Sequence, residues 1–515
     1  MTMMTEADFK PVFGEPVPLP ACAATPRVRV LNRSQLLMLY VDIERLIPDD
    51  HPAKAIWELV GTLDLSAFYE KVKAVEGRAG QAGFDPRLLI GIWLYGTSRG
   101  INSARELSER CDWEPGLQWL CAMGSVNYHS LSTFRVNHGE ALKKLFIELL
   151  GVLSAQGLVK LERLSVDGTR VRANCSDESF LRGKKLQEHL EAAAAHVEAL
   201  EQQPEDTSKR QQAARERSWR ERQQRVAAAQ EQFNQLQEQR GPGKAAQAQV
   251  STTEADARIM KQSGGGFAPS YNLQLATDEK AKIIVAAVVS NNGADTQLLT
   301  EVLDEVNEVV AKRPGQVLVD GGYVSADNLS KMQERGVELI GPVPDAVAGV
   351  NKQAKQRGVS EAYFRDAFRY DSDQDTYRCP EGKVLVHIKQ RQRGGGSIEH
   401  QYRAKRSDCA ACPHKMQCCP GASTHGRTVA RSEPSQSVKA FREKMQTGAY
   451  QQLYRKRSEV AEFPNAWLKE KLGLRRFQLR GLGKVAVESL WAVITYNVQQ
   501  WIRLVWQTKL TPVEA

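Results

Sequence analysis

Two aspartates each follow a short apolar run and directly precede a glycine. They are Asp167, in "SVDGTR", and Asp320, in "LVDGGY". A carboxylate at the end of a strand faces open space, and two such strands lying side by side would bring the carboxylates together. Like charges at close range raise each other's pKa unless cations lie between them, and oxygen-preferring Mg²⁺ suits such a pair. Since Asp-Gly also makes ordinary turns, it is the pair, each member after an apolar strand, that indicates a metal site.

Two metal ions held by carboxylates can activate a nucleophile and stabilise the leaving oxygen of a phosphodiester. The C-terminal part of the chain carries the positive charge that such a substrate needs. Residues 451–515 contain 11 Lys/Arg and 5 Asp/Glu, a local net charge of +6. Within them, "YRKRSEVAEFPNAWLK" is predicted to be one helical segment, and it carries Tyr454, Arg457, Glu462 and Lys469.

This segment, together with "VDGTRVRANCS", "VDGGY" and "LGLRRFQLRGLGKVAVESLWAVITYNVQQWIRL", resembles bacterial insertion-sequence transposases of the Asp-Asp-Glu (DDE) type. Among these, the chain is similar to the insertion-sequence family numbered eleven eighty-two, over nearly its whole length. The resemblance implies a core like that of ribonuclease H (RNase H) and retroviral integrases. It also implies two Mg²⁺ ions, with Mn²⁺ as a substitute, bound by Asp167 on the first core strand, Asp320 on the fourth and Glu462 on a late helix.

The resemblance gives the neighbouring basic residues a role as well. Tyr454, Arg457 and Lys469 look like the Tyr-Arg-Glu-Lys signature of related transposases, in which the basic members hold DNA phosphates. Four residues separate Arg457 from Glu462 where the signature usually has three, and a proline lies two residues after the glutamate rather than next to it. Glu459 therefore remains an alternative third carboxylate, and Glu462 could also be an ordinary solvated glutamate of a helix.

The reaction implied by the resemblance is hydrolysis of a phosphodiester at a transposon end, followed by attack of the freed 3′-hydroxyl on target DNA. No covalent protein intermediate is required. The implied partners are double-stranded DNA, as terminal inverted repeats and as target, and a second copy of the chain in a homodimer on DNA. Two other functions stay open: a DNA-binding protein that has lost catalysis, and a metal-dependent nuclease without strand transfer.

A further basic group follows in "GLRRFQLRG", which contributes Arg475, Arg476 and Arg480. Arg476 and Arg480 are four residues apart, so on a helix they would share a face. Arginine binds phosphate through paired N–H donors. We therefore predict that these arginines contact DNA, although a solvated basic surface would have the same composition.

Five of the nine cysteines lie between positions 379 and 419. Cys409 and Cys412 have the Cys-x₂-Cys spacing of a structural Zn²⁺ site, in which four thiolates complete a tetrahedron. The predicted ligands are Cys379, Cys409, Cys412 and Cys418, with Cys419 and His414 in reserve. The alternative is a loop with reduced thiols. The remaining cysteines, namely Cys22, Cys111, Cys121 and Cys175, are scattered and predicted to be packed in the fold.

The periodicity of apolar residues predicts the elements that must position these groups. Residues 35–150 are predicted to form short helices, with Ser130 to Arg135 opening a recognition helix of helix-turn-helix type. A strand over 160–173 ends near Asp167, two long helices fill 183–240, and a hairpin is followed by a helix with Asp295 as its N-cap. The predicted fold class is α/β: an RNase H-like mixed sheet with flanking helices.

The predicted domains are a helical, DNA-binding domain at 1–150, a catalytic core at 151–180 and 246–350, and basic C-terminal helices of the core at 431–515. Two insertions interrupt this order: a helical hairpin at 181–245 and a cysteine-rich segment at 351–430.

Length and charge are compatible with this prediction. The chain has 515 residues, enough for several domains, and a formal net charge of +9, which favours an acidic partner such as nucleic acid. The N-terminal "MTMMTEADFK" is not a secretory signal, and no apolar run is long enough to span a bilayer. Nine cysteines in 515 residues do not make a disulfide scaffold. We expect a bacterial cytoplasmic, nucleoid-associated protein without a membrane partner.

Overall fold

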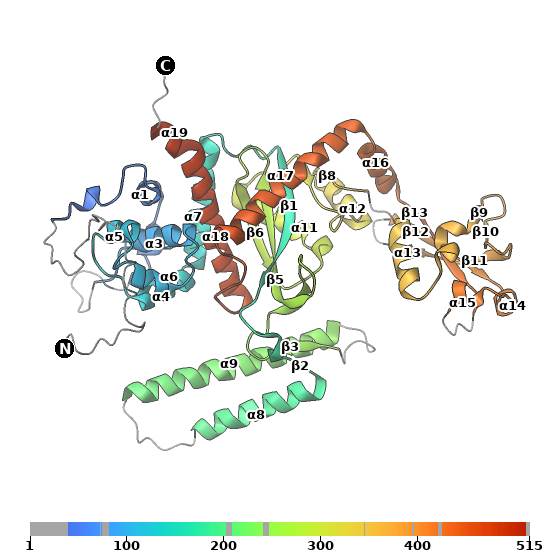
Figure 1. The fold of residues 1–515 in the computed structure, drawn as a ribbon, viewed down its shortest axis with the longest axis horizontal. Coiled ribbons are helices and arrows are strands. Elements are labelled where there is room, and N and C mark those ends of the chain that lie inside the picture. Colours follow the sequence, from blue (N-terminus) through green and yellow to red (C-terminus); the bar gives the residue numbers. More distant parts are fainter. Residues whose placement is uncertain are drawn as a thin grey trace, which may run out of the picture. The chain divides into compact units, whose positions relative to one another are not determined.

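The computed structural model describes residues 40–72, 74, 82–201, 209–239, 247–343, 346–393, 396–420 and 425–510 (Figure 1). Ile43–Ala515 form one compact unit, separate from Met1–Asp42. The mixed α/β class predicted from the sequence is confirmed. In the described ranges, no helix is long and apolar enough to cross a membrane.

The first part of the described chain is helical, as predicted. A proline is the first residue of α1, α3 and α5, where a backbone N–H would have no partner within the helix. The side chain before each proline, from His51, Asp85 or Glu114, caps the helix by accepting a backbone N–H. These helices share one hydrophobic cluster with the C-terminal helix α18 (Leu482–Trp501), which packs on α3, α6 and α7. The helices are α1 (Pro52–Gly61), α2 (Ser66–Tyr69), α3 (Pro86–Ser98), α4 (Ala104–Arg110), α5 (Pro115–Leu120), α6 (Tyr128–Asn137) and α7 (Gly139–Ala155).

The helix predicted to open at Ser130 begins instead at Tyr128, because Asn127 caps it by accepting from the Ser130 N–H. Its Arg135 is 5% exposed and forms a 3.0 Å ion pair with Glu488 of α18. A buried, paired guanidinium is costly to separate from its partner. The Arg135 side chain therefore joins α6 to α18, and the predicted contact of this helix with DNA stays a prediction for its other residues.

The central sheet has the strand order β4-β5-β1-β7-β8, and β6 also pairs with β5. β5 is antiparallel to β1, β4 and β6, whereas β7 is parallel to both β1 and β8. Helix α11 (Leu299–Val310) packs on β5 and β6, and α17 (Gly448–Glu470) contacts β1, β5 and β8. The strands are β1 (Arg163–Arg172), β4 (Arg258–Lys261), β5 (Phe267–Asp278), β6 (Ile284–Ser290), β7 (Gln316–Leu318) and β8 (Glu338–Ile340); α12 (Ala326–Glu334) connects the last two.

Two long helices, α8 (Gly183–Glu201) and α9 (Lys209–Gln239), occupy the segment where two were predicted, and they pack on each other. A short antiparallel pair, β2 (Phe180–Arg182) and β3 (Gln249–Ser251), closes their base. Residues 202–208, between the two helices, and residues 240–246, after the second one, lie outside the described residues.

The cysteine-rich segment contains a sheet that the sequence did not reveal. Five antiparallel strands have the order β13-β12-β11-β10-β9 and enclose a small hydrophobic cluster of their own. Most of β11 is exposed, so it carries polar residues. These polar residues hide the apolar–polar alternation by which a strand is identified in a sequence. The elements are β9 (Arg369–Asp371), β10 (Thr376–Arg378), β11 (Val384–Gln392), β12 (Ile398–Ala404), β13 (Thr428–Glu433), α14 (Arg406–Ala410) and α15 (Lys415–Cys418), preceded by α13 (Ala346–Gln356).

The C-terminal part is helical except for residues 471–481. Gly473 follows the end of α17 and Gly481 precedes α18. Their φ values of 72° and 87° are in the left-handed region, which a helix cannot include. The helix predicted through "GLRRFQLRG" is therefore wrong: this segment is a loop beside β1, where Phe477 N donates to Arg172 O at 2.9 Å. The helices are α16 (Gln436–Met445), α17, α18 and α19 (Gln507–Leu510), with a π-helical turn at Ile502–Trp506.

Candidate active site

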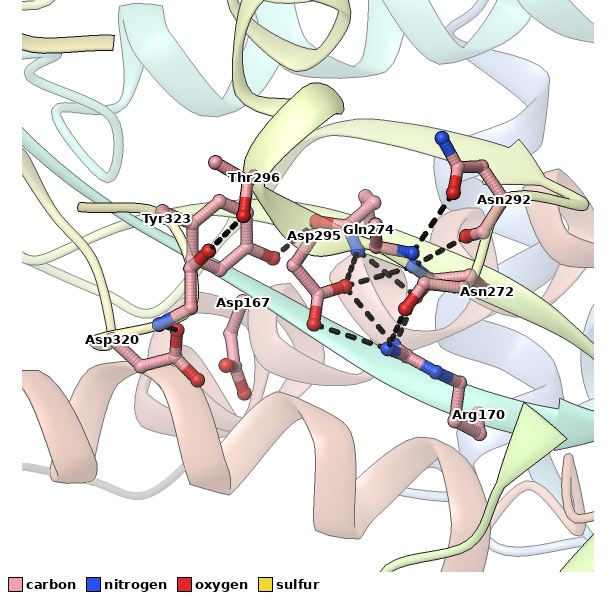
Figure 2. A network of polar contacts seen from close by, with 12 residues as sticks. Asp167, Arg170, Asn272, Gln274, Asn292, Asp295, Thr296, Asp320 and Tyr323 are labelled. Atoms are coloured by element: carbon pink, nitrogen blue, oxygen red, sulfur yellow. Dashed lines mark hydrogen bonds and ion pairs between the residues drawn. The ribbon is translucent and has the colours of Figure 1, made fainter. Parts of the chain in front are cut away.

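The register of two parallel strands brings Asp167 and Asp320 together. Ser165 of β1 is paired with Leu318 of β7, and each aspartate lies two residues further along its own chain. Residues two apart on a strand share a face, so both carboxylates leave the sheet at the same place. Figure 2 shows them side by side. The predicted pairing of two strand-borne carboxylates therefore agrees with the register.

The prediction that β1 ends near Asp167 is wrong, however. β1 continues to Arg172, because β5 pairs with it from Leu164 to Arg172. Only β7 stops, at Leu318. Because β7 stops at Leu318, Asp167 has no partner on β7, and it lies in the middle of β1 rather than at its tip.

Helix α17 supplies the partners of Asp167. Arg457 Nη2 donates to Asp167 Oδ1 and Asn465 Nδ2 donates to Asp167 Oδ2, both at 2.7 Å. Burial raises the pKa of the Asp167 carboxyl to about 6; the charges of Asp320 and Asp295 add to the rise, and Arg457 opposes it. The Asp167 side chain is only 18% exposed. The site therefore holds a carboxylate whose charge is incompletely compensated by the protein.

Asp320 lies in the turn after β7. Its Oδ1 accepts the Gly322 N–H at 2.7 Å, which makes an Asx turn. Gly322 O in turn accepts from Thr296 Oγ1 at 2.6 Å, and Asn328 Nδ2 donates to both Thr296 O and Tyr323 O. These bonds fix the backbone that carries Asp320.

A third carboxylate, Asp295, was missed as a site residue. It was predicted to be an N-cap, but it begins a 3₁₀ turn (Asp295–Gln297), and its side chain points back to the sheet (Figure 2). Asp295 Oδ1 accepts from Asn272 Nδ2 and Gln274 Nε2, both at 2.8 Å, and Oδ2 pairs with Arg170 Nη2 at 3.0 Å. Because each partner comes from a different strand position, no local pattern could identify this network.

The Asp295 network also reaches the Asp320 turn through the side chain of Gln274. Gln274 Oε1 accepts a hydrogen bond from the buried hydroxyl of Tyr323, three residues after Asp320. Arg170 Nη1 also donates to Asn272 Oδ1 at 2.5 Å, so β1, β5 and the Asp295 turn are joined. The arrangement holds the two carboxylate-bearing segments in a fixed relation.

Gly168 is required by close packing rather than by a turn. A Cβ atom at this position would lie 2.3 Å from Gln274 Nε2 and 2.9 Å from Asp295 Oδ1. The glycine after Asp167 therefore makes room for the network that crosses β1.

We expect Gly168→Ala to lower the free energy of unfolding by about 1–3 kcal/mol, because overpacking would displace the Asp295 network. Denaturant titration measures this change, and cleavage assays below both melting temperatures should show a loss of activity. Gly151→Ala in α7 is the matched control, since nothing lies within 4 Å of its added Cβ. It should stabilise the protein slightly. Equal effects of the two substitutions would contradict the packing argument.

Three of the predicted α17 residues lie near Asp167, and the predicted glutamates do not. Tyr454, Arg457 and Lys469 lie within electrostatic reach of Asp167: burial raises the pKa of Tyr454, with Asp320 and Asp167 adding to the rise, and burial lowers the pKa of Lys469 while Asp167 opposes this. Asn465, which was not predicted, faces Asp167 directly.

Glu462 is exposed, and it lies about 140° around α17 from Arg457, five residues earlier. Glu459 is also exposed and pairs with Lys282 at 2.6 Å. The structure thus brings Asp167, Asp320 and Arg457 together, but it does not place either glutamate beside them.

The donor set fits a hard cation in part. Asp167 and Asp320 offer carboxylate oxygens, and Asn465 Oδ1 is buried without a hydrogen-bond partner. Such oxygens suit Mg²⁺. Across the described ranges, however, no three His, Cys, Asp or Glu side chains gather closely enough to hold a metal ion. In this arrangement, the two aspartates and Asn465 supply only some of the oxygen ligands that Mg²⁺ takes.

The arginines of the 471–481 loop bind backbone carbonyls. Arg476 donates from Nε to Ala173 O and from Nη2 to Cys175 O, both at 3.1 Å, and Arg480 Nε donates to Asn174 O at 2.9 Å. Arg475 forms an ion pair with Glu470. DNA contact by these three side chains stays a prediction, and their visible bonds hold the loop against the end of β1.

The Arg476→Ala/Arg480→Ala double variant separates these roles. Loss of the carbonyl bonds should lower stability by about 1–3 kcal/mol. If the same arginines also bind phosphates, affinity for many DNA sequences should fall about equally, and the salt dependence should flatten by roughly 1 in slope for each phosphate that is no longer bound. Binding titrations at several salt concentrations test this against Arg335→Ala, whose partner Asp304 is exposed. If the affinity and the slope are unchanged, these arginines hold the loop and do not bind DNA phosphates.

The predicted zinc ligands lie in the second sheet, far along the chain from the carboxylates, and line one cavity together with Cys419. His414 does not line it; its Nε2 lies 3.7 Å from Glu381 Oε1. Cys111 and Cys175 are buried and Cys121 is partly buried, as predicted for packed thiols, whereas Cys22 lies outside the described residues.

Comparison with known proteins gives matches to two families. Residues 378–502 match the family described as "Transposase DDE domain", and residues 41–137 match "Transposase domain (DUF772)". Both families are described as transposase domains, and each match covers one segment of the chain. No curated protein matches the chain. A structure of the piggyBac transposase synaptic complex with hairpin DNA is similar at 10% identity and a TM-score of 0.30, covering 92% of this chain and 76% of that one.

Proposed function

We propose that this chain is a DDE transposase that binds the ends of an insertion sequence, cleaves phosphodiesters there and joins the 3′ end to target DNA. The observation that carries the proposal is the pair of carboxylates beside helix α17: Asp167 on β1 and Asp320 just after β7, the strand parallel to it. The two family matches add to it, since one covers α17 and the other the N-terminal helices.

The sheet supports an RNase H-like core. If the short strands β2, β3 and β4 are left aside, the chain order gives β1, β5 and β6 as antiparallel neighbours, followed by β7 and β8 in parallel. Asp167 then lies on the first strand and Asp320 directly after the fourth, which are the positions that the resemblance implies. The two long helices α8 and α9 and the cysteine-rich sheet interrupt this order as insertions.

The chemistry follows from which groups surround the carboxylates. Mg²⁺, or Mn²⁺ in its place, would bind Asp167 and Asp320 and neutralise the negative charge that builds up on a phosphodiester under attack. Glu462 is the proposed third carboxylate. Arg457 bonds Asp167 through Nη2, so its other N–H groups remain for a phosphate oxygen. Lys469 and Tyr454 would position the DNA strand.

The proposed partners are double-stranded DNA and a second copy of the chain. The net charge of +9 and the basic residues of α17 favour association with DNA. Two transposon ends must be joined in one event, so we propose a homodimer on DNA, acting in a bacterial cytoplasm. The helices α1 to α7 would contribute recognition of the ends through faces other than that of Arg135.

The test begins with the DNA on either side of the gene, which should contain matching inverted repeats. A duplex carrying one repeat is then incubated with the full-length protein, Mg²⁺ and a second DNA. The proposal expects specific binding, cleavage at the repeat end and joining to the second DNA. Cleavage without joining would identify a nuclease, and binding without cleavage an inactive descendant; either outcome overturns the proposal.

A further inference from the structure

Five thiols gather in the cysteine-rich sheet, although they are up to 40 positions apart. Cys379 follows β10, Cys409 lies in α14, and Cys418 ends α15. Together with Cys412 and Cys419 they line one cavity of about 30 Å³. The sequence indicated only the close pair of Cys409 and Cys412; the fold of the sheet brings Cys379 to the same place.

Backbone groups in this cavity point at sulfur. The Lys383 N–H donates to Cys379 Sγ and the Arg427 N–H donates to Cys409 Sγ, each at 3.3 Å. The first bond closes a tight turn in which Gly382 has a φ of 76°. N–H donors stabilise sulfur most when it carries negative charge, as a metal-bound thiolate does. Two of the five sulfurs therefore already accept a backbone N–H, as metal-bound sulfurs commonly do.

Thiolates that share one small cavity would repel one another, and a cation among them would remove the repulsion. Arg427 also lines the cavity and donates from Nη1 to Cys418 O at 3.0 Å. Its charge would offset part of the net negative charge of a four-thiolate site.

The size of the core gives an independent reason for a bound metal. Around this sheet, the described residues form a separate cluster of six buried apolar side chains: Phe368, Tyr377, Leu385, Tyr402, Ala404 and Val429. Cores of this size rarely stabilise a fold alone, and small modules commonly add a disulfide or a metal. No disulfide joins the described cysteines.

We propose that Cys379, Cys409, Cys412 and Cys418 bind one structural Zn²⁺ ion that holds the cysteine-rich sheet together. Cys379, Cys409 and Cys418 pack against the hydrophobic cluster of the sheet, which favours Cys418 over its neighbour Cys419 as the fourth ligand. Each thiol gives its proton to water as it binds. Since no three of these described side chains yet stand at metal-binding spacing, their sulfurs must turn inward to about 3.8 Å from one another, the spacing set by Zn–S bonds of about 2.3 Å.

Metal analysis of the purified full-length protein is the first test, and we expect about one Zn²⁺ per chain. The Cys409→Ser/Cys412→Ser double variant should lose the zinc, whereas Cys121→Ser, outside the cavity, should keep it. Cys419→Ser should also keep it, while Cys418→Ser should not. Wild-type protein without zinc, or a double variant that retains it, would overturn the proposal.

A second measurement keeps the result independent of folding defects. Protein loaded with Co²⁺ in place of zinc should show the visible absorption of a tetrahedral thiolate site, unchanged in Cys121→Ser. A strong chelator should lower the melting temperature of the wild type but not that of the double variant. Mass analysis under non-reducing conditions shows whether any two of the five cysteines form a disulfide. Such a disulfide would be a covalent link in place of zinc, and it would also overturn the proposal.

Discussion

Asp167→Asn and Asp320→Asn should each reduce DNA cleavage by at least about 100-fold while leaving binding to the transposon end largely intact. Each change keeps the shape of the side chain but removes a negative oxygen from the pair that would hold the cation, and catalysis here rests on positioned charge. Binding of the DNA end depends on basic residues elsewhere, so its affinity should not fall with the cleavage rate. Gel-shift and cleavage assays on the same end duplex measure both quantities.

Asp327→Asn in α12 is the matched control, because that carboxylate is exposed and pairs only with Lys331 one turn away. It should cleave like the wild type. A variant of Asp167 or Asp320 that cleaves normally would contradict the assignment of the site.

The raised pKa of Asp167 adds a stability prediction with a definite sign. The folded-state pKa of about 6 lies above the ordinary value of 3.8, so the folded protein binds this proton more tightly than the unfolded chain does. Ionised Asp167 therefore destabilises the metal-free fold above pH 6, by at most about 3 kcal/mol, and the penalty disappears below pH 3.8. In a chelator, Asp167→Asn should melt higher than wild type at pH 7.5, and its advantage should shrink toward pH 4. A variant that melts lower at pH 7.5 would contradict this.

Glu462→Gln should also abolish cleavage, by about 100-fold or more, whereas Glu459→Gln should not. Glu459 pairs with Lys282, and it lies about 160° around α17 from Arg457, the residue that binds Asp167. Glu462 lies seven residues before Lys469, which is within electrostatic reach of Asp167, and seven residues are close to two helical turns. A modest rotation or side-chain movement would therefore bring Glu462, but not Glu459, toward the carboxylates.

Cleavage assays of the two variants in parallel decide the third carboxylate, with circular dichroism as a check that α17 remains helical. Since both substitutions remove one charge from the same helix, differences in general affinity for DNA cancel between them. Loss of activity in Glu459→Gln with normal cleavage by Glu462→Gln would reverse the assignment. Normal cleavage by both would point to Asn465 and substrate oxygens as the remaining ligands.

Local patterns in the sequence were enough to predict the elements whose residues repeat with the period of a helix or a strand. A hairpin, a helix after it and a buried strand before Asp320 were all predicted, and the structure has β5 with β6, α11 and β7 there, because burial imposes such patterns locally. Asp167 and Asp320 were singled out because each follows an apolar run that predicts a strand, whereas the roles predicted for Tyr454, Arg457 and Lys469 of α17 came from the family resemblance.

Which residues lie opposite each other could be learned only from the folded chain. Asp-Gly at 167–168 is typical of a turn, but pairing with β5 keeps it in a strand, and the glycine is needed because Gln274 and Asp295 cross above it. Asp295, Asn465 and the carbonyl-bound Arg476 gain their roles from partners 21 to more than 300 positions away. The cysteine-rich sheet was missed because its strands are short and mostly exposed, so burial leaves almost no period in them. A contact between distant residues is set by strand register and helix packing, and these depend on the whole core rather than on any local pattern.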